Sequence, residues 1–256
     1  MTGRDGAGMR HTNHSITLPE TITACLFDMD GVLTSTAELH RTAWKQVFDE
    51  FLRARRGASF RPFTEQDYLD HVDGRPRRDG VRQFLASRGI TLPEGSPEDP
   101  HDLSTVHAVG NRKNDLLEKL IEERGVDPYP GSVRFVRAAH DAGLALGVVT
   151  SSANGKRVLD ATGLAPLFLV RVDGVVIDEE GLRGKPAPDS FLAAAKRLGV
   201  EPAATAVFED ALSGVEAGRA GAFGHVVGVD RAGNGHAQAL REHGADAVVT
   251  DLGELL

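Results

Sequence analysis

The first apolar run of the chain ends on two aspartates that are separated by a single residue. Asp28 and Asp30 closely follow the run CLF, and Gly31 comes next. Two carboxylates about 4 Å apart repel by about 4 kcal/mol at an effective dielectric of about 20, so such a pair must gain protons or bind cations. Once the pair is neutralised, Asp28 can attack phosphorus as a nucleophile, and Asp30 can exchange a proton with a hydroxyl group.

Three more polar segments stand where strands are expected to end. Thr150–Ser152 follow the run LGVV, and the pair Glu209 and Asp210 follows AVF. Lys185 lies between these two segments, in GKPAPD. Ligands of open α/β sheets bind at the carboxyl ends of the strands, so we expect all four segments to converge. They would gather four carboxylates, three hydroxyls and one ammonium.

A hard divalent cation is the natural partner for such a cluster, because Mg²⁺ is bound in proteins by a few carboxylates together with phosphate oxygens. The cation, Lys185 and the Thr150 hydroxyl would hold the phosphoryl oxygens as charge shifts. Each segment alone has a plainer interpretation: a solvated turn, a helix cap, a rigid loop or a helix start. Their occurrence in this order, each after an apolar run, favours a phosphoryl-transfer site.

Five short apolar runs predict the strands of a parallel sheet that is buried on both faces. They do not alternate between polar and apolar residues, and they read ITACLF, LALGVVT, TAVF, GHVVGV and DAVVT. Helical patterns lie between the later runs. SVRFVRAAHDAG ends on a glycine that suits a helix C-cap, and apolar residues recur at helical spacing from Phe191 to Leu198. Strands that alternate with helices from residue 131 onward predict an open α/β sheet.

Residues 36–124 interrupt this alternation with a pattern of helices. An apolar stripe around Trp44 has helical spacing, and the stretch from Ser35 to Glu38 predicts a capping box at its start. RRDGVRQFLASRG and NRKNDLLEKLIEERG predict two more helices, which the surface loop TLPEGSPEDPHD separates. The predicted organisation is a flexible tail at 1–18, an α/β core at 19–35 and 125–256, and a helical cap domain at 36–124.

Composition excludes several classes of function. The chain has 256 residues and a formal net charge of −8, without a block of lysines and arginines that would bind nucleic acid. No apolar stretch approaches the ~20 residues that span a bilayer, and the polar first 15 residues do not resemble a signal peptide. Cys25 is the single cysteine and is expected in the core. We expect a cytoplasmic monomer that acts on a small molecule.

The four polar segments resemble, in order, the four motifs of the haloacid dehalogenase-like phosphotransferases: DMDGVLT, VVTSS, GKPAPD and FEDALSG. The resemblance spans nearly everything from Thr21 onward. It implies a Rossmann-like, doubly wound parallel sheet with a helical cap inserted after the first strand. It also implies that Asp28 is the nucleophile and Asp30 the acid/base. The implied Mg²⁺ ligands are Asp28, the main-chain carbonyl of Asp30 and Asp210, with Glu209 close by or ligating.

Within that superfamily the chain is most similar to the β-phosphoglucomutases, through AELH with AWK, VDGRPRRDG, NRKND and SSAN. The implied reaction interconverts β-D-glucose 1-phosphate and glucose 6-phosphate through an aspartyl-phosphate enzyme and β-glucose 1,6-bisphosphate. The resemblance places the distal phosphate at Arg77, Ser152 and Asn154. It places the sugar at Lys113 and Asn114. The full set of implied substrate-binding residues is His40, Trp44, Gly74, Arg77, Lys113, Asn114, Ser151, Ser152 and Asn154.

Several points stay open at the level of sequence. Ala153 stands where some relatives have a lysine at the distal phosphate, and Ser35 where many have an aspartate. Arg75 or Arg78 could take the place of Arg77, and Trp44 has the alternative role of core or hinge packing. With water as the acceptor, the same chemistry would make the chain a Mg²⁺-dependent sugar-phosphate phosphatase. A non-catalytic binding protein is the third alternative, and the complete acidic set argues against it.

Overall fold

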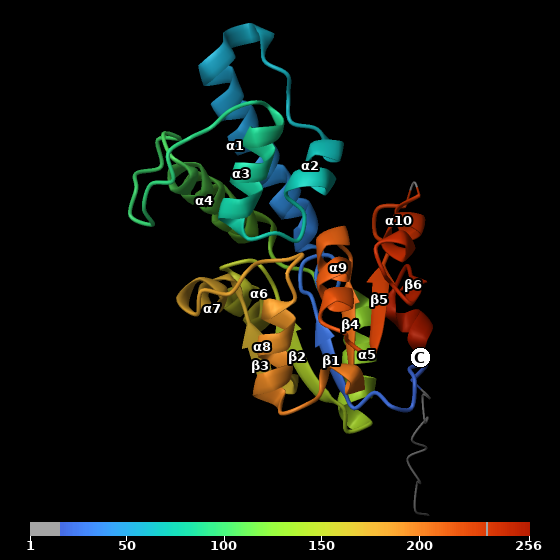
Figure 1. Cartoon of the computed structure of the whole chain (residues 1–256). Helices are drawn as coiled ribbons and strands as arrows, with labels where there is room; N and C mark the ends of the chain where they lie inside the picture. The colour runs from blue at the N-terminus through green and yellow to red at the C-terminus, as the bar shows by residue number, and fades with distance from the viewer. Residues whose placement is uncertain (1–15, 234) are drawn as a thin grey trace, which may run out of the picture.

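The computed structural model describes residues 16–233 and 235–256, and its core is a six-stranded sheet (Figure 1). The strand order is β3-β2-β1-β4-β5-β6, and all neighbouring strands are parallel. The winding reverses between β1 and β4, which confirms the predicted doubly wound, Rossmann-like sheet. The strands are β1 (Ala24–Phe27), β2 (Ala145–Val149), β3 (Val170–Val172), β4 (Thr205–Glu209), β5 (His225–Val229) and β6 (Ala247–Val249).

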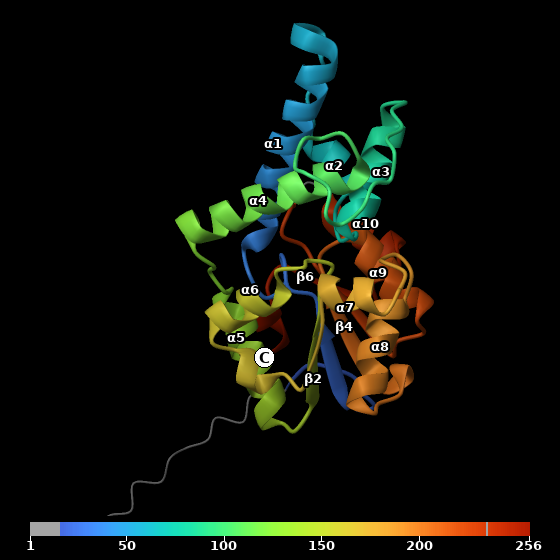
Figure 2. The same cartoon turned by 90° about the vertical axis from the view of Figure 1, so that its left-hand side faces the viewer.

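Side chains of the central strands alternate between two apolar cores, one on each face of the sheet. On one face Phe27 and Phe208 stack with ring centroids 4.6 Å apart, next to α5 and α6. On the other face Leu26 and Val207 pack with α7 to α10, and Figure 2 shows the sheet between the two groups of helices. Cover on both faces explains the continuous apolar runs. These helices are α5 (Pro130–Asp141), α6 (Gly155–Thr162), α7 (Gly174–Glu179), α8 (Asp189–Leu198), α9 (Leu212–Ala220) and α10 (His236–Glu242).

Helices α1 to α4 form a layer above the C-terminal ends of the strands (Figures 1 and 2). The layer has an apolar cluster of its own, in which the ring of Phe48 lies 5.0 Å from Trp44 and 4.1 Å from Phe84 between centroids. Such a cluster gives the layer internal stability apart from the sheet. The helices are α1 (Thr36–Arg56), α2 (Glu65–His71), α3 (Arg77–Ser87) and α4 (Val106–Arg124).

The local structure differs from the sequence predictions at several elements. Ser35 is the N-cap residue of α1 but makes no side-chain cap bond, so the predicted capping box is wrong. Its hydroxyl donates instead to the Asp127 carbonyl at 3.3 Å, which ties the start of α1 to the core. Strand β3 and helices α2 and α7 are absent from the predicted elements, because segments of three to seven residues are too short for a clear hydrophobic period.

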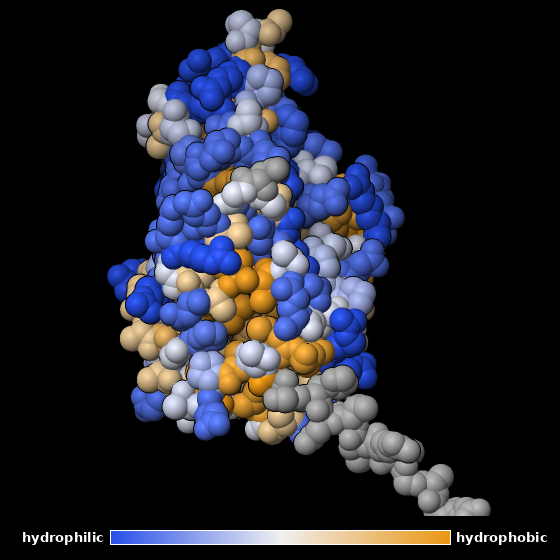
Figure 3. All heavy atoms as spheres, turned by 90° about the vertical axis from the view of Figure 1, so that its right-hand side faces the viewer, coloured by the Kyte–Doolittle hydropathy of each residue, from blue (hydrophilic) through white to orange (hydrophobic). Residues whose placement is uncertain are grey.

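The periphery of the sheet is built from short segments. Edge strands β3 and β6 have three residues each, which limits pairing with another sheet edge. Figure 3 views the side of β5 and α10, where apolar side chains gather below the mostly hydrophilic helical layer.

Residues 16–18 of the predicted tail attach to the core, with the Thr17 amide 2.8 Å from the Leu255 carbonyl. Residues 1–15 of that tail lie outside the described residues. Within the described ranges, no helix has the length and apolar character needed to cross a membrane.

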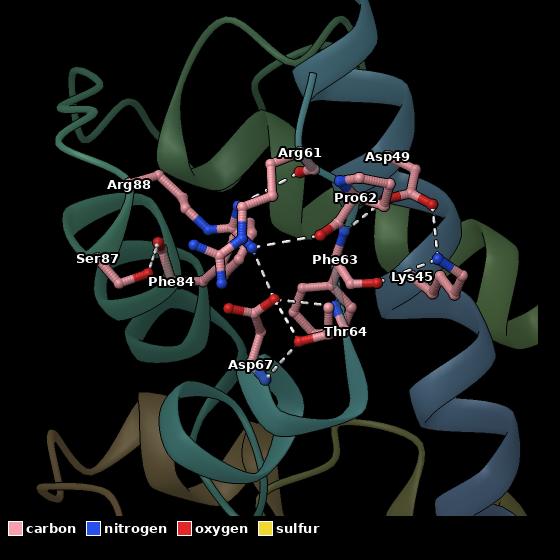
Figure 4. A network of polar contacts seen from close by, with 10 residues as sticks. All are labelled: Lys45, Asp49, Arg61, Pro62, Phe63, Thr64, Asp67, Phe84, Ser87 and Arg88. Carbon is pink, nitrogen blue, oxygen red and sulfur yellow. Dashed lines mark hydrogen bonds and ion pairs between the residues drawn. The ribbon is translucent and has the colours of Figure 1, made fainter. Parts of the chain in front are cut away.

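A polar network fixes the loop that precedes α2 inside the helical layer (Figure 4). Arg88, just after α3, donates to the Asp67 carboxylate at 2.6 Å, and both side chains are only 10% exposed. Asp67 also accepts the amide of Thr64 at 2.9 Å and its hydroxyl at 2.7 Å. The Asp67 amide donates to Thr64 Oγ1 at 3.1 Å, which completes a capping box. Burial opposes the charge of Asp67, but these bonds and Arg88 outweigh it and lower the pKa of this carboxyl. Asp49 of α1 accepts the Phe63 amide at 2.8 Å and so connects α1 to the same loop.

We expect Arg88→Leu to lower the free energy of unfolding by about 1–3 kcal/mol, because it leaves the Asp67 carboxylate half-satisfied in a nearly buried position. Urea denaturation followed by circular dichroism measures this change. Arg55→Leu, at an exposed position of α1, is the matched control and should change the free energy by less than about 0.5 kcal/mol. Equal effects of the two substitutions would contradict the role given to the network.

Candidate active site

The site is centred on a lysine whose ammonium group is buried between two carboxylates. Lys185 is 2% exposed, and its Nζ lies 2.6 Å from Asp28 Oδ1 and also donates to Glu209 Oε1. Burial alone would favour the neutral amine, but Asp28 and Glu209 outweigh it and raise the pKa of Lys185. The ammonium group is therefore a permanent part of the site, and it holds the ends of β1 and β4 together.

Three carboxylates crowd around this ammonium group. One oxygen each from Asp28, Glu209 and Asp210 lies within 4.8 Å of the other two. Burial, joined by neighbouring carboxylates, raises the pKa of Asp28 and of Asp210 well above the ordinary range, although Lys185 acts in the opposite direction on both. Three carboxylates and one ammonium leave two negative charges, which a single divalent cation neutralises.

The donor set fits Mg²⁺, because all the side-chain ligand atoms are oxygens and their charge matches that of the ion. Both oxygens of Glu209 already accept hydrogen bonds, Oε1 from Lys185 and Oε2 from the Ala211 amide at 3.0 Å. Among the described residues, no group donates a hydrogen bond to the Asp210 carboxylate. This difference favours Asp28 and Asp210 as direct ligands, with Glu209 as the residue that holds Lys185.

The two loops that carry the acidic residues touch each other at Gly31. A Cβ atom at this position would lie 1.9 Å from Asp210 Oδ2, and the Gly31 backbone has φ +95°. Both the contact and the left-handed backbone therefore require glycine. The carboxylate of Asp210 rests directly on the turn that follows Asp28 and Asp30.

Asp30 is oriented by two hydroxyl groups. Thr150 Oγ1 donates to Asp30 Oδ2 at 3.0 Å, and Thr36 Oγ1 donates to Asp30 Oδ1 at 2.5 Å. Thr150 was predicted to hold phosphoryl oxygens, and in this structure its hydroxyl holds the Asp30 carboxylate. The sequence prediction omits Thr36, because STAE has the pattern of a capping box and draws attention to Ser35 instead. Only the fold places residue 36 beside residue 30.

A cavity of about 330 Å³ lies between the strand ends and the helical layer. Asp28, Asp30 and Asp210 line its sheet side, and Arg77 and Lys113 line its helical side. Of the other predicted site residues, Asn154, Lys185 and Glu209 do not line it. Those that do are His40, Trp44, Gly74, Asn114, Thr150, Ser151 and Ser152.

The cationic side of the cavity is held in place by buried groups. Lys113 Nζ lies 3.1 Å from His40 Nδ1 and 5.0 Å from the centroid of the Trp44 ring, and His40 Nε2 lies 3.4 Å from Asp30 Oδ1. Burial, followed by the charge of Arg77, lowers the pKa of Lys113 to about 7. Burial, followed by the charge of Lys113, lowers the pKa of His40 to about 4. An anion in the cavity would favour the charged form of Lys113.

The arginines near α3 have different surroundings. Arg78 is engaged by an ion pair with Asp178 of α7. The Arg77 side chain lies against α4, where a Cβ at Gly110 would come within 3.3 Å of Arg77 Cγ. Burial lowers the pKa of Arg77. Arg75, Arg77 and Arg78 all line the cavity, so the role of Arg77 at the distal phosphate stays a prediction.

The helical layer is joined to the core by a seam of hydrogen bonds at the edge of the cavity. Ser151 Oγ donates to the Gly74 carbonyl at 2.7 Å, and Ser213 Oγ donates to the Asp73 carbonyl at 2.8 Å. Gly74 has φ +70°, and a Cβ there would lie 2.4 Å from Ser213 Oγ. Asn154, predicted to bind phosphate, donates to Asn114 at 3.0 Å and adds a further bond to the seam.

Comparisons with known proteins agree with this geometry. A family model described as haloacid dehalogenase-like hydrolase matches residues 22–221. A β-phosphoglucomutase of Mycobacterium tuberculosis (strain CDC 1551 / Oshkosh) is 57% identical over 244 residues, which cover 93% of each chain. A fructose-1-phosphate phosphatase of Escherichia coli (strain K12) is 30% identical over 76% of this chain and 90% of its own. The crystal structure of a β-phosphoglucomutase from Clostridium difficile has a TM-score of 0.73 at 24% identity, over 92% of this chain and 93% of that one, and so shares the fold.

The family match contains every segment that the site brings together. Asp28, Thr150, Lys185 and Asp210 all lie within residues 22–221; three of them follow a strand, and Lys185 lies in the loop between α7 and α8. Because the family model matches most of the chain, the chain belongs to the haloacid dehalogenase-like hydrolase family.

Proposed function

We propose that the chain is a β-phosphoglucomutase, which interconverts β-D-glucose 1-phosphate and glucose 6-phosphate. The observation that carries this proposal is the two-sided cavity, with carboxylates at the sheet and cations at the helical layer. A sugar bisphosphate has a phosphate at each end, so such a cavity suits it in either of two orientations. The 57% identical mycobacterial protein bears the same name, which supports the assignment.

The proposed chemistry begins at the Asp28 carboxylate. One of its oxygens forms a bond to phosphorus, and the bond between phosphorus and the sugar oxygen breaks. Asp30 gives its proton to the departing sugar oxygen, and Thr36 and Thr150 keep the Asp30 carboxyl in position. Lys185 remains beside Asp28 and offsets the negative charge of the phosphoryl group. Asp28 and Asp210 would hold Mg²⁺, which would supply further positive charge to the phosphoryl oxygens.

The second half of the reaction uses the same residues in reverse. The free 6-hydroxyl group of β-glucose 1-phosphate bonds to the phosphorus on Asp28, the bond between phosphorus and the Asp28 oxygen breaks, and the hydroxyl proton passes to the Asp30 carboxylate. The β-glucose 1,6-bisphosphate formed in this way must turn around before the next cycle, so that its 1-phosphate lies at Asp28 and glucose 6-phosphate can leave. We assign Arg77 and Lys113 to the phosphate and sugar that lie away from Asp28, because both line the far side of the cavity.

Exclusion of water decides between this function and a sugar-phosphate phosphatase. The similarity to a fructose-1-phosphate phosphatase keeps hydrolysis as the second candidate. The seam made by Ser151 and Ser213 favours the mutase, because it seals the helical layer against the core at the cavity edge. On this proposal, residues 36–124 are a cap that opens to exchange substrates over a core of residues 19–35 and 125–256. We expect this enzyme to work as a monomer in the cytoplasm.

Product stoichiometry tests the proposed function. We expect β-glucose 1-phosphate, Mg²⁺ and a trace of β-glucose 1,6-bisphosphate to yield glucose 6-phosphate with little inorganic phosphate, because the sugar rather than water accepts the phosphoryl group. Enzymatic assays of both products measure the ratio. Asp28→Asn is the control and should lose at least about 10³-fold in rate, because the amide is not a nucleophile. Equal amounts of phosphate and sugar product would instead identify a phosphatase.

The seam predicts the effect of removing its two hydroxyl groups. We expect Ser151→Ala with Ser213→Ala to raise the fraction of phosphoryl groups lost to water several-fold, because the cap closes less tightly over Asp28. The ratio of inorganic phosphate to glucose 6-phosphate measures this partition. Ser87→Ala is the matched control, since its hydroxyl donates to the Phe84 carbonyl within the helical layer, away from the seam. A double variant with the wild-type ratio would show that the seam does not exclude water.

A further inference from the structure

The segment that leads from β5 into the first turn of α10 contacts both loops that carry the acidic residues, although none of its described residues lines the cavity. Arg231 Nε donates to the Gly31 carbonyl at 3.0 Å, in the loop after β1. His236 Nε2 lies 2.7 Å from the Asp210 carbonyl, in the loop after β4. A carbonyl oxygen only accepts hydrogen bonds, so the proton of this histidine ring lies on Nε2.

The Arg231 side chain is rigidly held. Its Nη1 donates to the Thr250 carbonyl at 2.6 Å and lies 3.4 Å from Asp251 Oδ2. Its guanidinium carbon lies 3.7 Å from the centroid of the Tyr129 ring, within the range of a cation–π interaction. A donor fixed on three sides in this way gives the Gly31 carbonyl a defined position.

Hydrogen bonds also hold the backbone at the beginning of this segment. Asp230 extends the sheet, because its amide donates to the Val249 carbonyl at 2.8 Å. Its Oδ1 accepts the amides of Ala232 at 3.1 Å and Gly233 at 2.7 Å, which folds the chain into a tight turn. His236 then begins α10, with its ring directed at Asp210.

The two contacts act on loops that touch each other. The Asp210 carboxylate rests on Gly31, so a shift of either backbone carbonyl changes the spacing between Asp210 and the aspartates of the first loop. Metal ligands depend on such outer contacts for their orientation, and loss of one typically weakens metal binding 10- to 100-fold. We propose that Arg231 and His236 are positioning residues that clamp the loops after β1 and β4 at the spacing required for a divalent cation. This inference rests on the proposed function, since it assumes that the acidic cluster binds Mg²⁺.

Calorimetric titration of the substrate-free protein with Mg²⁺ tests the clamp without reference to catalysis. We expect His236→Ala to weaken Mg²⁺ binding about tenfold. His236→Gln should recover most of this loss, because its amide can donate to the same carbonyl. His243→Ala is the matched control: this histidine directly follows the same helix and contacts the Ala239 carbonyl of that helix at 2.8 Å. We expect the control to bind Mg²⁺ like the wild type.

Arg231→Met should weaken Mg²⁺ binding to a similar extent, and Arg241→Met, on α10, is its control. If His236→Ala does not fold, His236→Phe retains the ring volume without the donor and is expected to show the same loss. If the variants of His236 and Arg231 have dissociation constants for Mg²⁺ within twofold of the wild-type value, the positioning role of these two residues is wrong, and the proposed function is unaffected. A wild-type protein that binds no Mg²⁺ would overturn the proposed function as well, so the two failures are distinguishable.

Discussion

The structure depends on the burial of one ammonium group among carboxylates at the ends of two central strands. Lys185 holds Asp28 and Glu209 together, yet the cluster still has an excess of negative charge. Removing such groups from water is expensive unless their charges are matched, and a divalent cation would match the charge of this cluster. The excess negative charge, which calls for a divalent cation, therefore also suits the site to chemistry on phosphate.

The topology of the sheet explains how residues distant in sequence come to share this site. Strands β1 and β4 are neighbours, and their register pairs Phe27 with Phe208, so the acidic residues that follow must lie side by side. The winding of the chain reverses at this pair, where open α/β sheets bind their ligands. The helical layer then closes the cavity from above with positive charge from Arg77 and Lys113. Two sides of opposite charge suit a substrate that must be held by both ends.

Much of the sheet and the acidic cluster could be predicted because apolar runs and their polar ends are local features of the sequence. The four motifs around Asp28, Thr150, Lys185 and Asp210 can be recognised from their order and spacing in the sequence alone. Contacts that depend on tertiary packing could not be predicted in this way. Thr36 reaches Asp30 through a turn whose pattern resembles a helix cap, and the donors that meet the carbonyls of Gly31 and Asp210 carry no signature in the sequence. The motifs specify the reacting groups, whereas the fold specifies what orients them.

The central claim is that a divalent cation completes the charge balance of the cluster around Lys185. A crystal structure of the protein grown with Mn²⁺, which gives an anomalous signal, tests it most directly. We expect one anomalous peak in contact with carboxylate oxygens of Asp28 and Asp210, while Lys185 stays within hydrogen-bonding distance of Asp28. A saturated crystal with no peak at these aspartates, or with Lys185 displaced from Asp28, would contradict the account.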